Sequence, residues 1–136
     1  MNSRAITEDD FERVAALLRE DEERLLGRES RVGANDLREW LSRTDLAEDS
    51  WLYEDDGEVV AAGWTDLAPG NEVAIGIGVV GERWQGRGLG AQLLQRSEQR
   101  ARDRRAARMH AIALGADRAA SELIASYGFT EIRARN

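Results

Sequence analysis

Three glycines at alternate positions, Gly86, Gly88 and Gly90, lie between an apolar run and a long helical pattern. The run 72–80 predicts a strand, and the apolar residues that follow from Gly88 at intervals of four predict a helix. Glycine lets a ligand approach the backbone, and the first turn of a helix carries free N–H groups at its positive end. The junction therefore predicts a phosphate-binding turn, with a turn that serves only packing as the alternative.

Composition excludes several kinds of chemistry. The 136 residues predict a single domain, 1–136. The chain has no cysteine, and His110 is its only histidine, so thiolate nucleophiles, disulfides and metal sites built on His and Cys are excluded, and no metal is expected. All 19 basic residues are arginine, which excludes a lysine Schiff base and a P-loop lysine.

Charge is divided unequally along the chain, whose formal net charge is -7. Residues 1–66 hold 8 of the arginines and 19 of the acidic residues, whereas residues 67–136 hold 11 and 7. The acidic balance argues against nucleic acid or a membrane as partner, and no apolar run is long enough to span a bilayer, so a soluble, cytoplasmic protein is expected. The division suggests that the second half meets an anionic ligand and the first half a cationic one; merely solvated faces are the alternative.

Periodicity predicts a mixed α/β (α+β) fold in which helices cover a central sheet. A Thr7 hydroxyl that accepts a helix N–H is expected to cap the first helix, and Asn35 or Asp36 the second. Asp55 to Gly57 is expected to close a hairpin. The expected strands are 4–6, 51–53, 59–64, 72–80, 109–114 and 129–133, and the expected helices are 7–25, a short one after residue 35, a long one from 88, and 118–127.

A dinucleotide-binding fingerprint is one interpretation of the junction, because Gly86, Gly88 and Ala91 fit GxGxx(G/A). That motif needs an acidic residue about 20 positions further on and a second βαβ half. The strand 109–114 ends at Leu114 without an acidic residue, and too little chain follows. This interpretation is excluded.

A second interpretation rests on two sequence motifs. Residues 85–90, QGRGLG, resemble the (Q/R)xxGx(G/A) motif of the GNAT-type N-acetyltransferases, and Val80 lies where that family has a valine on its fourth strand. Residues 117–129 resemble the family's second signature, NxxAxxxYxxxGF. The resemblance covers nearly the whole chain. It implies a central mixed sheet of about six strands, splayed between the fourth and fifth and flanked by four helices, without the family's seventh strand.

The resemblance also implies a function: transfer of an acetyl group from acetyl-CoA to a primary amine of a small molecule or peptide, by direct attack. In this family the pantetheine arm lies along the fourth strand, and the loop amides hold the pyrophosphate. Gly76 and Gly78 would open one face of that strand to the ligand, with a loosely packed strand as the alternative. The implied acetyl-CoA-binding residues are Val79, Val80, Gln85, Gly86, Arg87, Gly88, Leu89, Gly90, Ala91, Asp117 and Ile124.

The sequence indicates the catalytic residues less directly than the acetyl-CoA-binding residues. Ile124 stands where the family has the tyrosine that protonates the CoA thiolate, and Ser121 is the nearest hydroxyl on that helix face, unless it is an ordinary helix serine. Glu72 is the candidate general base, followed by Asp66 and then His110. Among the tryptophans, Trp84 is the candidate for substrate contact.

Two further expectations follow from the departures. A sheet without its seventh strand would leave an open edge, which predicts a homodimer. Together with Ile124, it also keeps open a non-catalytic CoA-binding or subunit-forming module, one half of a tandem protein or a fragment.

Overall fold

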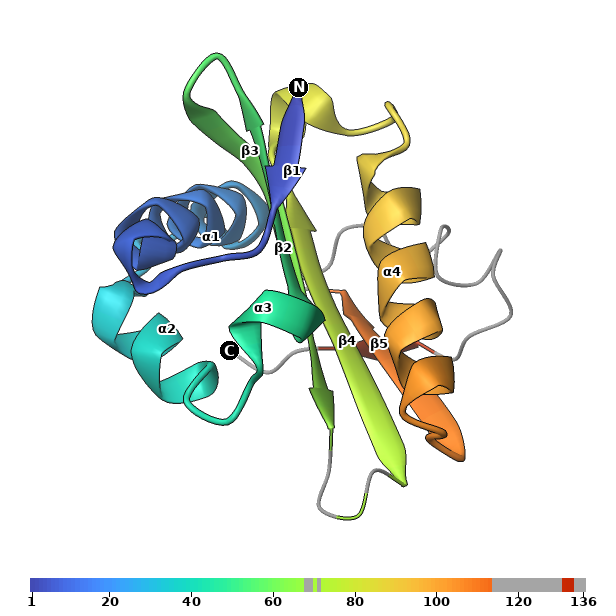
Figure 1. Ribbon diagram of the computed structural model, residues 1–136. Helices are drawn as coiled ribbons and strands as arrows, with labels where there is room; N and C mark the ends of the chain where they lie inside the picture. Colours follow the sequence, from blue (N-terminus) through green and yellow to red (C-terminus); the bar gives the residue numbers. More distant parts are fainter. Residues whose placement is uncertain (68–69, 71, 114–130, 134–136) are drawn as a thin grey trace.

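The computed structural model describes residues 1–67, 70, 72–113 and 131–133, and in these ranges six strands form one mixed sheet in the order β1-β2-β3-β4-β5-β6 (Figure 1). Neighbours from β1 to β4 pair antiparallel, whereas β4, β5 and β6 run parallel. The strands are β1 (Asn2–Arg4), β2 (Ser50–Asp55), β3 (Glu58–Leu67), β4 (Val73–Val80), β5 (Arg108–Ala113) and β6 (Glu131–Arg133). The helices are η1 (Glu8–Asp10), α1 (Phe11–Leu26), α2 (Ala34–Trp40), α3 (Leu46–Asp49), η3 (Glu82–Trp84) and α4 (Leu89–Asp103).

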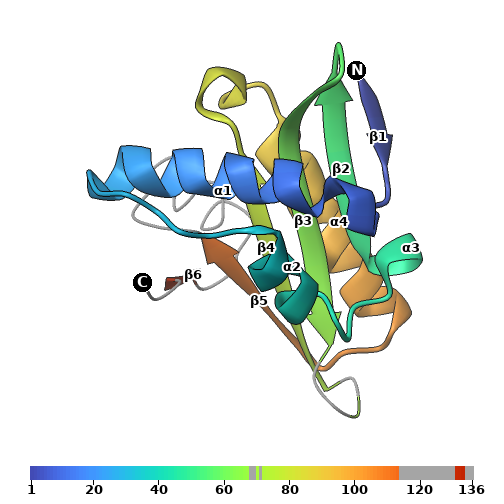
Figure 2. The same cartoon turned by 90° about the vertical axis from the view of Figure 1, so that its left-hand side faces the viewer.

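Helices cover both faces of the sheet, as the alternation of elements predicts. Helices α1 and α2 lie on one face, and α4 lies on the other (Figures 1 and 2). The expected mixed α/β fold is confirmed. The expected helix 118–127 lies outside the described residues, and none of the described helices has the length and apolar character needed to cross a bilayer.

The apolar stripe of α1 forms the larger core. Phe11, Val14 and Leu18 are buried against β3 and the rest of the sheet, together with Leu37 of α2 and Val79 of β4. Burying this stripe stabilises α1 more than its intrinsic helix propensity does.

The first predicted helix cap is confirmed, and the second differs from the structure. Thr7 is the N-cap of η1 and forms a capping box with Asp10: the Thr7 N–H donates to Asp10 Oδ2 at 2.8 Å, and its hydroxyl donates to the same oxygen at 3.0 Å. The N-cap of α2 is Gly33, whose N–H donates to Asp36 Oδ2 at 2.9 Å. In each case the carboxylate lies in the first turn and reaches back to the cap residue, where it also favours the positive helix end.

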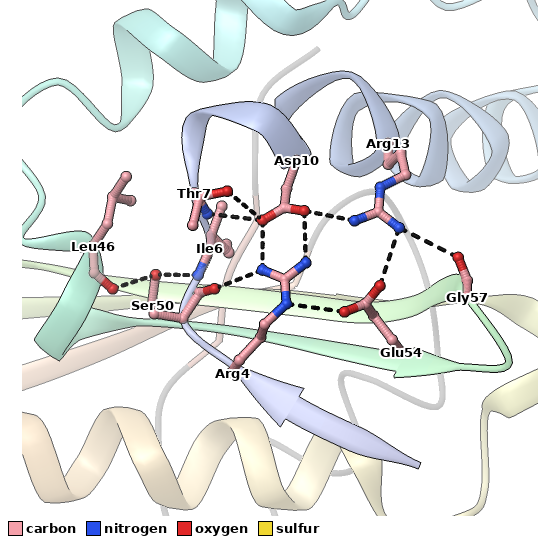
Figure 3. A network of polar contacts seen from close by, with 10 residues as sticks. Arg4, Ile6, Thr7, Asp10, Arg13, Leu46, Ser50, Glu54 and Gly57 are labelled. Carbon is pink, nitrogen blue, oxygen red and sulfur yellow. Dashed lines mark hydrogen bonds and ion pairs between the residues drawn. The ribbon is translucent and has the colours of Figure 1, made fainter.

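A polar network fixes the start of the chain to the sheet (Figure 3). The side chain of Asp10 is 3% exposed and accepts two bonds from Arg4, at 2.7 and 2.8 Å, and one from Arg13 at 2.6 Å. Glu54 of β2 accepts from the same two arginines at 2.9 and 3.1 Å. The Arg4 guanidinium, together with the Thr7 N–H and Arg13, holds the pKa of Asp10 well below its usual range.

Two of the strand glycines make room for α4. A Cβ built on Gly76 would lie 3.0 Å from Ser97 of α4 and from the Met109 methyl, and one on Gly78 would lie 3.5 Å from Leu93. The space beside these glycines is therefore filled by helix side chains. The prediction that they open β4 to a ligand is wrong, because their missing side chains lie on the face that α4 covers.

The end of α4 offers a stabilising substitution. Arg105 adopts φ +57°, and the next residue closes the helix with a bond from the Ala106 N–H to the Ala101 carbonyl at 2.9 Å. This position usually holds glycine, since a side chain there is strained. Arg105→Gly is expected to raise the free energy of unfolding by about 0.5–1 kcal/mol, measured by urea denaturation. Arg102→Gly inside the helix is the control, and it should lower that free energy by about 1 kcal/mol. A lower free energy of unfolding in both variants would contradict the conclusion that the backbone at Arg105 is strained.

Candidate functional site

The junction between β4 and α4 is built by two glycines with left-handed backbone. After Val80 the chain makes the short helix η3, and Gly86 and Gly88 then adopt φ +78° and +87°. Gly88 is the N-cap of α4. Other residues rarely adopt these angles, so the local fold depends on glycine at both positions.

The same two glycines leave open space in front of the helix. No heavy atom lies within 4 Å of a Cβ built on Gly86 or on Gly88. This differs from Gly76 on β4, where neighbouring side chains fill the space. The loop backbone is therefore accessible to a ligand, and a side chain at Gly88 would project into that space.

The first turn of α4 presents unpaired N–H groups to this space. The bond from the Gln92 N–H to the Gly88 carbonyl, at 3.0 Å, begins the helical series, so Leu89, Gly90 and Ala91 have no helical acceptor for their N–H groups. Among the four described α-helices, α4 alone has no acidic residue in its first turn. Free N–H groups at a positive helix end without carboxylates favour an anion.

A cation is held beside the loop. The guanidinium of Arg87 lies 4.7 Å from the ring centroid of Trp84, within the range of a cation–π contact. Trp84 is half-buried and packs on the second core cluster, which contains Tyr53 of β2 and Leu89 of α4. An apolar anchor in the core therefore restricts an exposed arginine at the mouth of the loop.

The last two residues of β4, Val79 and Val80, lead into the loop before α4. Within the described residues, β4 pairs with β5 from Val73 to Gly78, opposite Arg108 to Ala113. The Gly81 N–H donates to the Val60 carbonyl of β3 at 2.8 Å. Since successive residues direct their backbone groups to opposite edges, the N–H and C=O of Val80 face the β5 side. The chain after Ala113 lies outside the described residues, so the expected splay between β4 and β5 stays a prediction.

Gln85 contributes a contact that the sequence pattern did not reveal. Its side-chain Nε2 donates to the Val80 carbonyl at 3.3 Å, which ties the loop to the end of β4. The motif indicates a role for the Gln85 backbone amide only. The loop and the strand end therefore form one continuous surface, which brings together the predicted residues from Val79 to Ala91.

The candidate bases lie at the other end of the sheet. Glu72 is exposed and precedes β4, eight residues from Val80, or about 26 Å of extended chain. Asp66 pairs across from Ile75, about 17 Å from Val80 along the strand. Burial raises the pKa of the Asp66 carboxyl, although the Thr44 hydroxyl donates to it at 2.7 Å. His110 lies opposite the same Ile75, so the structure brings none of the three to the loop.

Three predicted residues, Asp117, Ser121 and Ile124, lie outside the described residues. The part of the chain that the structure describes holds no group of three or more His, Cys, Asp or Glu side chains arranged to bind a metal ion.

Solved structures with a similar fold are acetyltransferases. A GCN5-related N-acetyltransferase from Sphaerobacter thermophilus is 22% identical, with a TM-score of 0.81 over 93% of this chain; the chain spans only 42% of that protein. The protein yncA from Salmonella typhimurium, solved with its cofactor acetyl-CoA, is 20% identical, with a TM-score of 0.72 over 95% of this chain and 79% of its own. The GNAT domain of S. lividans PAT is 25% identical, with a TM-score of 0.70 over 94% and 80%.

Sequence comparison reaches the same family. No curated protein matches the chain. The family model of the acetyltransferase (GNAT) family matches residues 11–129, which include β4, the glycine loop and α4. The match covers most of the chain and agrees with the fold of the solved structures. The chain belongs to the GNAT acetyltransferase family.

Proposed function

We propose that the protein is an N-acetyltransferase that uses acetyl-CoA to acetylate a primary amine by direct attack. The observation that carries the proposal is the open glycine loop, whose free N–H groups adjoin the end of β4. A structurally similar protein, yncA, was solved with its cofactor acetyl-CoA. No metal is required in this proposal.

The residues present fit the coenzyme. The backbone from Gln85 to Ala91 and the Arg87 guanidinium would hold the pyrophosphate, because both favour phosphate oxygens. The backbone of Val79 and Val80 would hold the pantetheine arm along the β5-facing edge. Asp117 and Ile124 complete the proposed binding set on the resemblance alone.

When bound, acetyl-CoA supplies a thioester whose carbonyl carbon bonds to the amine nitrogen as its carbon–sulfur bond breaks, so the ammonium form of the amine yields an amide, free CoA and one proton. The chain contributes binding and orientation, which favour reaction between two held groups. Glu72 stays a prediction as the base that accepts that proton. Ser121 stays a prediction as the proton donor to the thiolate.

An acetyl-CoA turnover assay over a panel of primary amines tests the proposal. The expected result is release of free thiol together with an acetylated amine identified by mass. Because Ile124 replaces the family's tyrosine, a non-catalytic CoA-binding module is the second candidate. It predicts that CoA raises the melting temperature while no amine is acetylated.

Arg87 and Trp84 offer a test of how the anion is held. Arg87→Ala is expected to weaken acetyl-CoA binding by about tenfold at low salt and by less at high salt, because salt screens an exposed charge pair. Trp84→Leu should weaken binding too, but should add little once Arg87 is alanine, since the ring acts by holding the guanidinium. Isothermal titration calorimetry measures both. Equal losses from Trp84→Leu with and without Arg87 would show that the ring acts only through packing.

The homodimer expected from the sequence stays a prediction, which sedimentation velocity tests.

A further inference from the structure

A cavity of about 270 Å³ lies between α1, the β2–β3 turn and η3. Its apolar walls come from Leu17 of α1, Val60 of β3 and Trp84 of η3. This volume is near the lower limit for small-molecule sites, so the cavity suits a small ligand with an apolar part.

The cavity adjoins the proposed coenzyme site from the α1 side of the sheet. Gly81 lines it and directly follows Val80, so the two Cα atoms are about 3.8 Å apart. A Cβ built on Gly81 would lie 3.4 Å from Leu17 Cδ1, which shows that this residue faces α1. The glycine loop leads instead to α4 on the opposite face (Figure 2). A ligand in the cavity would therefore approach the end of β4 from the side opposite α4.

Carboxylates dominate the charge around the cavity. Glu20 of α1, Glu58 of β3 and Glu82 of η3 line it, together with Arg13 and Arg83. Glu20, Glu58 and Glu82 are exposed, so their charges face solvent at its mouth.

One of the two arginines is already compensated. Arg13 donates to Asp10 at 2.6 Å and to Glu54 at 3.1 Å, in the network at the start of the chain. Glu82 has a longer contact of 3.7 Å with Arg24. Among the described contacts, Arg83 is thus the one cavity arginine without an ion pair, and it faces two carboxylates without one, Glu20 and Glu58. The local field favours a cation.

We propose that this cavity binds the ammonium form of the acceptor, a small primary amine with an apolar substituent. The proposal rests on the proposed N-acetyltransferase function and names the class of its second substrate. Alkyl amines are cations at neutral pH, since the pKa of an alkylammonium is about 10.4. The proposal also accounts for the unequal charge of the two halves of the chain. Helix α1 and the β2–β3 hairpin, which line the cavity, come from the acidic half, and the glycine loop comes from the basic half.

A binding experiment tests the site without turnover. The probes are 2-phenylethylamine, a cation, and 2-phenylethanol, its neutral counterpart of nearly the same shape, titrated into ¹⁵N-labelled protein. The amine is expected to shift the amide signals of Gly57, Gly81 and Glu82, and to bind at least several-fold more tightly than the alcohol. High salt should reduce the difference. Equal affinities, or shifts that exclude these three amides, would overturn the proposal.

Substitutions connect the site to the reaction. Glu58→Gln and Glu20→Gln are each expected to raise the KM for the amine by about two- to fivefold, and the double variant by about tenfold, as for exposed charge pairs. The KM for acetyl-CoA should stay unchanged. Glu12→Gln, an exposed α1 carboxylate that pairs with Arg19 at 3.0 Å, is the matched control and should leave both values unchanged.

The outcomes separate this proposal from the proposed function. Acetylation with an unchanged amine KM in the double variant would overturn the cavity and leave the activity standing. Amine binding at the cavity with no acetylation of any amine would overturn the activity and, with it, the role of the cavity as an acceptor site. An effect of Glu12→Gln equal to that of Glu20→Gln would show only general charge attraction and would also overturn the proposal.

Discussion

Replacing Gly88 with valine is expected to abolish the rise in melting temperature that acetyl-CoA produces. A ligand at about 100 times its Kd stabilises the folded state by about 2.7 kcal/mol, and the variant should show almost none of it. Gly88 has φ +87°, and the space in front of it is open, so the new side chain both strains the N-cap and occupies the space proposed for the coenzyme. Differential scanning fluorimetry with and without acetyl-CoA measures the effect.

Gly27→Val is the matched control. Gly27 ends α1 with φ +67° and also has no heavy atom within 4 Å of a built Cβ, so the backbone strain is similar, but the position belongs to α1 and not to the glycine loop. This variant should melt at a lower temperature and keep its full response to acetyl-CoA. A full response in Gly88→Val would contradict the assignment of the loop.

Replacing Asp10 with asparagine is expected to lower the free energy of unfolding by about 2–3 kcal/mol. The amide presents an NH₂ group where the carboxylate accepted bonds from Arg4 and Arg13, and the site is buried (Figure 3). The cost is moderated because the two arginines are 40% and 42% exposed. Urea denaturation at neutral pH measures the loss.

Acidification distinguishes loss of charge from loss of packing. Because the arginines depress the pKa of Asp10 in the folded protein, its stabilisation is complete above the unfolded-state pKa, about 3.9, and is lost as pH falls below it. Between pH about 5 and about 3 the wild-type protein should therefore lose more stability than Asp10→Asn. Parallel pH profiles for the two proteins would show that the carboxylate charge does not matter.

The parts of the fold that the sequence predicted well are those governed by short-range rules. The hairpin turn follows from Asp56 and Gly57, which both adopt positive φ, and the strand–loop–helix junction follows from Gly86 and Gly88. Helix α3 was missed because its four residues are too few for a periodic pattern.

The candidate base could not be fixed from the sequence, for a different reason. Strand alternation tells which face a residue shares, but it does not tell how far along the strand the reaction occurs, so Glu72, which precedes β4, stays a prediction. The network around Asp10 was also unpredictable, since Arg13 meets Glu54 across 41 residues of sequence. Contacts of that range depend on the assembled sheet.

Helix α4 packs closely against Gly76 of β4, and this contact lies far from the N-terminus of the helix, where the glycine loop is. Ser97, which contacts that glycine, is nine residues from Gly88, or about 13 Å along the axis. A larger residue at Gly76 would push α4 away from the sheet at Ser97. The N-terminus of the helix would then shift, and the glycine loop with it, although the loop residues are unchanged. The conformation of the glycine loop therefore depends partly on the contact between Gly76 and Ser97. We expect substitutions at that contact, as well as in the loop, to weaken the proposed binding of acetyl-CoA.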